Sequence, residues 1–153
     1  MTIGILILNR ILKLKISYPI IMEYIKYIFV VLYVIIDIIY ITVSAPFYSK
    51  TVQNIQGSPI KLRPSSYVAL VLAYIILGLG WMFIVANAIN RKTPYSKVIF
   101  IALVFALSVY GVFNTTLYVL FDNWDIITAL RDTLWGCVCI TTISVVYRYV
   151  AFS

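Results

Sequence analysis

Four polar side chains that could do chemistry lie within otherwise apolar runs of this sequence. They are Asp37, Asn114, Arg131 and Asp132. Ionisable groups at membrane depth cost several kcal/mol unless they face a protein interior, water or a partner, and they commonly mark proton or solute pathways. Two carboxylates and an amide that meet could bind a small polar solute, or accept and release a proton. Whether they meet depends on the elements that carry them.

The composition is that of a membrane protein. Of 153 residues, 63% are hydrophobic and 11% are charged. A soluble domain has about 25% charged residues, so a soluble all-α protein is the less favoured alternative. Crossing about 30 Å of hydrocarbon takes about 20 helical residues. We predict an all-α membrane protein, a four-helix transmembrane bundle over residues 23–153, with spans at about 24–43, 66–88, 97–121 and 126–148.

Residues 1–22 form a basic segment ahead of the bundle. Arg10 and Lys13 fall on one helical face, with Ile and Leu over most of the rest. This pattern is typical of an amphipathic helix that lies in the membrane interface. The alternative is a partly ordered basic tail. A cleaved signal peptide is disfavoured, because its basic residues would precede the apolar core.

The net charge of +7 reflects basic residues beside the apolar runs, so we expect the bilayer as the partner and no nucleic acid. Basic residues favour the cytoplasmic side. Eight lie on one side: Arg10, Lys13, Lys15, Lys26, Arg91, Lys92, Lys97 and Arg148. Three lie on the other: Lys50, Lys61 and Arg63. Both termini are therefore predicted to be cytoplasmic. The Ile-, Lys- and Asn-rich composition suggests an A/T-rich gene, such as that of a large virus or a parasite, so the membrane could be cellular or viral.

The connections and the second span carry two further signals. A loop of about twenty residues is expected between the first two spans, with Phe47 and Tyr48 as interfacial aromatic anchors. Small residues in the second span, Gly78 and Gly80 after Ala69 and Ala73, would let a neighbouring helix approach closely.

The polar side chains are predicted to converge in the outer half of the membrane. At 1.5 Å per residue, Asn114 lies about 12 Å below Asp122, and Asp132 about 10 Å below Asp125. Asp37 falls at a similar depth in the first span. Arg131 can reach outward or pair with either carboxylate. Packing around this layer is expected from Tyr110, Gly111, Trp135 and Gly136.

The sequence gives no support for an enzyme, a cofactor or a metal site. It contains no His, and its two cysteines, Cys137 and Cys139, lie two residues apart in the last span. They point to nearly opposite faces of a helix, so we interpret them as packing residues rather than as a disulfide or a metal site. We therefore expect a protein that is not an enzyme and holds no cofactor.

Several of these residues follow one another in an order that resembles a known family. The elements are Asp37, Phe47–Tyr48, Tyr110–Gly111–Val112–Phe113–Asn114, Trp124 and Asp132–Thr133–Leu134–Trp135–Gly136. They resemble the small four-span predicted membrane proteins of domain of unknown function 2177, over about residues 24–150. The resemblance implies the four-span fold, and it implies no activity. Against the family pattern, this chain has Asn114 where Asp is usual and Leu117 where Asn is usual.

Two functional hypotheses remain open. The first is a non-enzymatic structural or assembly component of a cellular or viral membrane, in which the polar layer holds the helices in register. The alternative is a small transporter or channel-like protein, in which the layer is a polar, proton-titrating site for a small polar solute. Because four spans enclose only a narrow path, we expect the second role to require a homo-oligomer.

Overall fold

The computed structural model describes the backbone of residues 2–152 and the side chains of residues 23–152. The chain is helical throughout this part apart from its turns. The helices are α1 (Thr2–Gln56), α2 (Pro64–Gly80), α3 (Tyr95–Ala106), α4 (Val112–Leu120) and α5 (Ile126–Phe152). Short π-helical and 3-10 segments, η1 (Trp81–Val85) and η2 (Ala86–Ala88), extend α2, and the π-helical segment η3 (Leu107–Gly111) joins α3 to α4.

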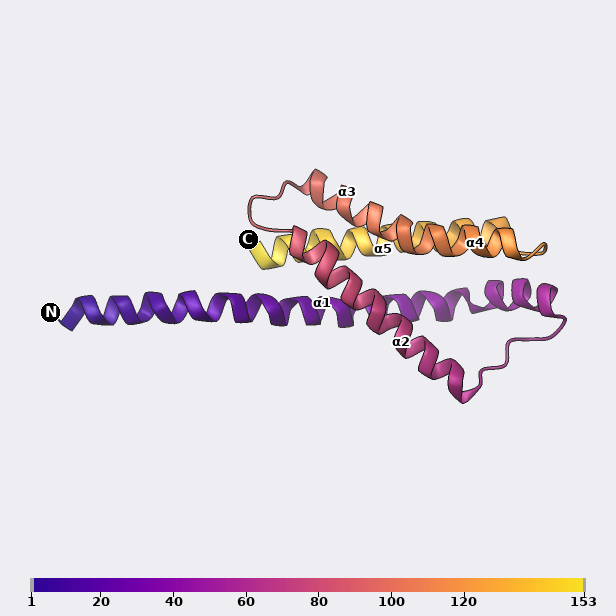
Figure 1. Ribbon diagram of the computed structural model, residues 1–153, viewed down its shortest axis with the longest axis horizontal. Coiled ribbons are helices and arrows are strands. Elements are labelled where there is room, and N and C mark those ends of the chain that lie inside the picture. The colour runs from indigo at the N-terminus through magenta and orange to yellow at the C-terminus, as the bar shows by residue number, and fades with distance from the viewer. Residues whose placement is uncertain (1, 153) are drawn as a thin grey trace.

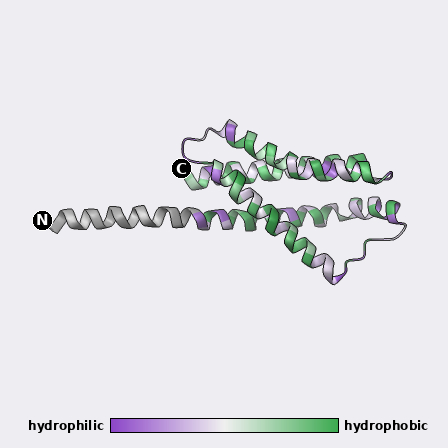
Figure 2. Cartoon of the chain, viewed as in Figure 1, coloured by the Kyte–Doolittle hydropathy of each residue, from purple (hydrophilic) through white to green (hydrophobic). Residues whose placement is uncertain are grey.

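These elements make four helices long and apolar enough to cross a membrane. They cover Glu23–Gln56, Pro64–Ala88, Tyr95–Leu120 and Ile126–Phe152. The predicted all-α fold with four spans is thereby confirmed. Large apolar side chains remain exposed along all four helices, such as Ile28, Ile76, Phe100 and Leu134. Figure 2 shows the same pattern, with hydrophobic colour recurring along all four spans. Such a surface fits a lipid environment rather than water.

The four helices alternate in direction, so the start of the bundle and the C-terminus lie at the same end (Figure 1). α5 packs against α1 on one side and against α3 and α4 on the other. α2 crosses at a steep angle, and its Pro64 end diverges from the other helices (Figure 1). Gly78 is accordingly the only buried residue of α2. The bundle is tight around α5 and open beside α2.

The two glycines near the end of α2 mark where it meets the bundle. A Cβ on Gly78 would lie 2.7 Å from Cγ1 of Val30 on α1, and one on Gly80 would lie 3.0 Å from the ring of Phe105 on α3. These contacts confirm the expected close approach at the two glycines, whereas Ala69 and Ala73 of the same predicted face are exposed. Next to this meeting point, Phe29, Trp81 and Tyr147 form an aromatic core. Trp81 donates its indole N–H to Ser144 Oγ at 3.0 Å.

The predicted twenty-residue loop after the first span is wrong. α1 continues through Pro46 to Gln56, and the turn begins at Gly57, which has a φ of 70°. Proline inside a helix removes one backbone hydrogen bond. Contacts with α5 hold this last part of α1 nonetheless, because Thr51 and Thr128 hydrogen-bond through their hydroxyls at 3.2 Å. Tertiary packing thus overrides the local turn signals.

α1 (Thr2–Gln56) takes in residues 2–22, which belong to the segment 1–22 that was predicted to be separate and amphipathic. The side chains of this segment, Arg10 and Lys13 among them, lie outside those that the structure describes. Its interfacial role therefore stays a prediction.

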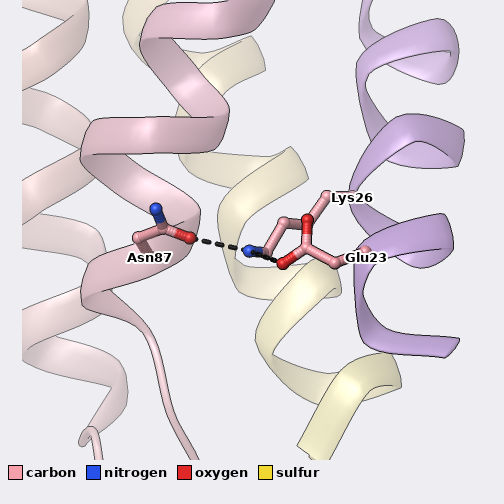
Figure 3. A network of polar contacts seen from close by, with 3 residues as sticks. All are labelled: Glu23, Lys26 and Asn87. Carbon is pink, nitrogen blue, oxygen red and sulfur yellow. Dashed lines mark hydrogen bonds and ion pairs between the residues drawn. The ribbon is translucent and has the colours of Figure 1, made fainter. Parts of the chain in front are cut away.

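The end of the bundle that holds the C-terminus is rich in basic residues tied to backbone and amide oxygens. Lys26 Nζ lies 2.7 Å from Glu23 Oε1 and 2.7 Å from Asn87 Oδ1, which joins α1 to the end of the second span (Figure 3). Arg148 donates to the carbonyl oxygens of Arg91 at 2.5 Å and Thr93 at 3.2 Å. These bonds fix the turn between the second and third spans on α1 and α5.

Candidate functional site

Asp37 is the first centre of the polar layer. It lies on α1 and is buried, with 5% of its surface exposed. Its Oδ1 accepts a hydrogen bond from Trp135 Nε1 on α5, and its Oδ2 accepts one from the Tyr74 hydroxyl on α2, both at 2.9 Å. One carboxylate therefore joins three of the four spans.

Asp132 on α5 is the second centre. Its Oδ1 accepts a hydrogen bond from the Tyr48 hydroxyl on α1, and its Oδ2 accepts one from Asn114 Nδ2 on α4 at 2.6 Å. Together, the two carboxylates connect all four spans through neutral donors.

The side-chain amide of Asn114 is held in one orientation. Its Nδ2 also donates to the Tyr110 carbonyl oxygen at 3.0 Å, and Thr133 Oγ1 on α5 donates to the same oxygen at 3.4 Å. Turning the amide over would place its oxygen against this carbonyl. Tyr110 lies in η3, and π-helical turns free carbonyl groups for such contacts and often occur at functional sites. The Asn114 Oδ1 atom is buried and has no hydrogen-bond partner among the described residues.

Close packing fixes the position of the layer. A Cβ on Gly136 would lie 2.3 Å from the Tyr110 ring, so only glycine lets this ring cross α5. The hydroxyl of Tyr110 hydrogen-bonds that of Tyr33. On the other side, the Trp135 ring stacks on Tyr40 with 4.2 Å between centroids. The predicted supporting residues Tyr110, Trp135 and Gly136 therefore contact the layer or one another.

A cavity of about 360 Å³ opens beside the two carboxylates, between α2 and the rest of the bundle. Its polar lining consists of Asp37, Tyr48, Tyr74, Tyr110 and Asp132. Its remaining lining is apolar: Ile41, Leu70, Ala73, Leu77, Val109 and Phe113. Ligand pockets commonly combine apolar walls with a few converging polar groups.

The carboxylates have no cationic partner within the described side chains of residues 23–152. Arg131, expected to pair with one of them or to reach outward, lies instead over the ring of Phe47, with its guanidinium carbon 4.0 Å from the centroid. The structure thus brings Asp37, Asn114 and Asp132 into one layer and leaves Arg131 on its exposed rim.

Two expectations about single residues differ from the structure. Tyr48, expected as an interfacial anchor, points inward to Asp132, whereas its neighbour Phe47 is exposed. Gly111 makes no close approach, because a Cβ there would meet nothing nearer than 3.9 Å. The reason for the first difference is that α1 continues as a helix past Pro46, which turns Tyr48 onto the same face as Asp37.

The sequence reasoning missed Tyr33, Tyr74 and Tyr48 as parts of the site. A usable signal was present for α1, because its polar residues recur at helical spacing: Tyr33, Asp37, Tyr40, Ser44, Tyr48 and Thr51. Such a stripe, three or four residues apart, marks one helix face. Four of its members are buried, and its period predicts the face that meets α5.

The comparisons with known proteins agree with this architecture. A family model described as predicted membrane protein (DUF2177) matches residues 20–149. The chain belongs to this family. No curated protein and no solved structure shows a significant match to the chain. Membership supports the four-span membrane fold and a lipid bilayer environment, and the family description names no reaction.

The arrangement suits binding better than covalent chemistry. Nucleophilic catalysis needs an activated nucleophile beside a base. The cavity offers two carboxylates and three phenols but no Ser, Cys or Lys side chain. Paired acceptors in an apolar setting can hold a cationic or hydrogen-bond-donating group.

Proposed function

We propose that this family member is a non-enzymatic membrane protein that binds a small solute in the cavity beside Asp37 and Asp132, and moves it across the membrane. The supporting observation is that both carboxylates line one cavity of about 360 Å³ that is otherwise mostly apolar. Of the two hypotheses from the sequence, this is the transporter-like one. We propose that it works as a homo-oligomer, with both termini in the cytoplasm.

The charge of the cavity supports a cationic solute. Neither carboxylate has a Lys or Arg partner among the described side chains, and all four carboxylate oxygens accept from neutral donors. Asp37 is buried and Asp132 is half-buried, and a carboxylate charge removed from water without a counter-charge is costly. A cation in the cavity offsets this cost, whereas an anion adds to it.

A structural role for the same network is the second candidate. It is favoured because the four hydrogen bonds to Asp37 and Asp132 link every span to another. Hydrogen bonds between membrane helices contribute about 0.6 kcal/mol each on average. In this case the layer holds the helices in register within a cellular or viral membrane and binds nothing.

Filling the cavity separates the two candidates. Ala73 lines the cavity without joining the hydrogen-bond network, and Ala69 lies one helical turn away on α2, outside the cavity. The probe is tetraphenylphosphonium, an apolar cation, with tetraphenylborate as its anionic counterpart. Binding is measured by equilibrium dialysis in nanodiscs, for the wild type, Ala73→Phe and Ala69→Phe.

We expect the cation to bind the wild type and Ala69→Phe, and to bind Ala73→Phe at least about ten-fold more weakly, with equal melting temperatures for the two variants. The anion should not bind above the level of empty nanodiscs. Equal cation binding in all three proteins, or none in any, would exclude the cavity as a binding site and leave the structural role. Asp37→Asn is the less decisive variant, because it removes a network member and a charge together.

A further inference from the structure

A second groove follows the other side of α2 and continues the cavity. It has a volume of about 440 Å³ and lies between α1 and α2. Its lining is mostly aliphatic, with Val34, Ile38, Val71 and Ile75 among others, and includes Tyr74. Leu70 and Tyr74 line both the groove and the cavity. The two spaces are therefore neighbours, and the side chain of Tyr74, which donates to Asp37, lies between them.

The groove and the cavity also follow one another along α1. The groove is lined by α1 residues from Tyr27 to Ile38, and the cavity by α1 residues from Asp37 to Tyr48. The groove thus covers about 16 Å of helix at 1.5 Å per residue. An extended chain advances about 1.2 Å per bond, so this length fits about 13 bonds. Of these two spaces, the cavity holds the carboxylates of Asp37 and Asp132, whereas no charged side chain lines the groove.

From this geometry we infer that the ligand is a single-chain cationic amphiphile, whose positive head lies at Asp37 and Asp132 and whose aliphatic chain lies in the groove between α1 and α2. The inference rests on the proposed function, because it names the class of solute that the cavity takes. Charge complementarity places the head, and the two shared residues, Leu70 and Tyr74, give the chain its path.

The openness of α2 explains how such a ligand enters. α2 meets the bundle at Gly78 and Gly80 and diverges toward Pro64 (Figure 1). The cavity and the part of the groove beside Leu70, Val71 and Tyr74 lie along this diverging part, and the groove ends where α2 meets the bundle, at Gly78 and Met82. Toward the basic end, the buried residues Phe29, Trp81 and Tyr147 fill the bundle. An amphiphile already in the bilayer can therefore reach both spaces from the side, between α2 and its neighbours.

The test compares two chain lengths on one head group. The probes are dodecyltrimethylammonium and butyltrimethylammonium, with dodecyl sulfate as the anion of equal chain length. Val71→Trp and Ile75→Trp each fill the groove, and both positions are at least half exposed in the wild type. Val68→Trp is the matched control, since Val68 is exposed on α2 and lines neither space. Affinities are measured in zwitterionic nanodiscs and corrected for binding to empty nanodiscs.

We expect dodecyltrimethylammonium to bind the wild type and Val68→Trp, and to bind both groove variants about ten-fold more weakly. The affinity for butyltrimethylammonium should be the same in all of these proteins, and dodecyl sulfate should not bind. Cation binding that is sensitive to Ala73→Phe but equal in the groove variants and Val68→Trp would overturn the inference and leave the proposed function standing. Absence of binding by every cation, tetraphenylphosphonium included, would overturn both.

Discussion

The indole of Trp135 on α5 donates a 2.9 Å hydrogen bond to Asp37 on α1. The same ring stacks on Tyr40, three residues further along α1, with an angle of 6° between the planes. One side chain thus supplies both a polar and an apolar contact between the first and last helices. This pairing fixes the rotation of α1 against α5 and directs the Asp37 carboxylate toward the cavity.

Replacing Trp135 by Phe removes the hydrogen bond and keeps an aromatic ring against Tyr40. We expect the free energy of unfolding to fall by about 1–3 kcal/mol, because a buried acceptor loses its donor. Trp124→Phe is the control, since the Trp124 Nε1 atom has no hydrogen-bond partner among the described residues. Unfolding in mixed micelles by titration with dodecyl sulfate measures both variants. Equal losses in the two would argue against the importance of the Asp37 bond.

Gly136→Ala tests the crossing of Tyr110 over α5. The added methyl group would lie 2.3 Å from the ring, which has no room to accept it without moving. We expect a loss of about 1–3 kcal/mol in the free energy of unfolding, the usual cost of overpacking. At Gly111 the nearest atoms to an added Cβ lie at 3.9 Å, so we expect Gly111→Ala to have a free energy of unfolding equal to that of the wild type or slightly higher. A stable Gly136→Ala variant would contradict the geometry at this crossing.

The start of α5 should give the protein a pH-dependent component of stability. The Thr128 hydroxyl and backbone N–H both donate to Asp125 Oδ2 at 2.8 Å, and these bonds lower the pKa of Asp125 below its ordinary value. A carboxylate with a lowered pKa in the folded state stabilises the fold above its ordinary pKa. That contribution is lost as the pH falls through the lowered pKa.

Melting temperatures of the wild type and Asp125→Ala, measured from pH 3 to pH 7, test this contribution. We expect the variant to melt earlier at pH 7 and the difference to shrink toward pH 3. Asp122→Ala, which removes an exposed carboxylate of the same turn, should show a smaller difference at every pH. A gap between the wild type and Asp125→Ala that is constant over pH would show that the side chain acts without its charge.

The orientation of the bundle can be read from chemical labelling in intact cells. Cys137→Ala/Cys139→Ala serves as the cysteine-free background, to which Ser58→Cys or Ser96→Cys is added. The excess of basic residues at the end that holds Lys26, Arg91 and Arg148 predicts that this end is cytoplasmic. A membrane-impermeant maleimide should then label Ser58→Cys in intact cells and Ser96→Cys only after permeabilisation. The reverse pattern would invert the topology.

The four spans could be predicted because each is an apolar stretch long enough to cross the bilayer, a signal that needs no tertiary information. The end of α1 at Gln56 was not predicted. Pro46 and the polar residues that follow are local signals for a turn, and what outweighs them is the contact of Thr51 with Thr128, which are 77 positions apart. The local trace of this contact is the recurrence of Tyr48 and Thr51 at helical spacing after Asp37, and the stronger turn signals obscure it.

The polar layer was predictable in part. Depth along each span places Asp37, Asn114 and Asp132 at one level, and the structure links Asn114 to Asp132 directly. Depth does not give rotation about the helix axis, so it could not exclude Arg131, which lies on Phe47 at the rim. The phenols of Tyr48 and Tyr74 were missed, because tyrosine is common in this chain, with 13 copies, and few of them mark a site.

The bond between Trp135 and Asp37 has a consequence for how the chain is made. Its two residues are 98 positions apart, so the ribosome adds Trp135 about 5–20 s after Asp37, at about 5–20 residues per second. Until Trp135 is made, the Asp37 carboxylate lacks its indole donor. Tyr74 follows Asp37 by only 37 positions and is the earlier partner. The hydrogen bonds of Asp37 are therefore complete only when the last helix has been made and packs against α1.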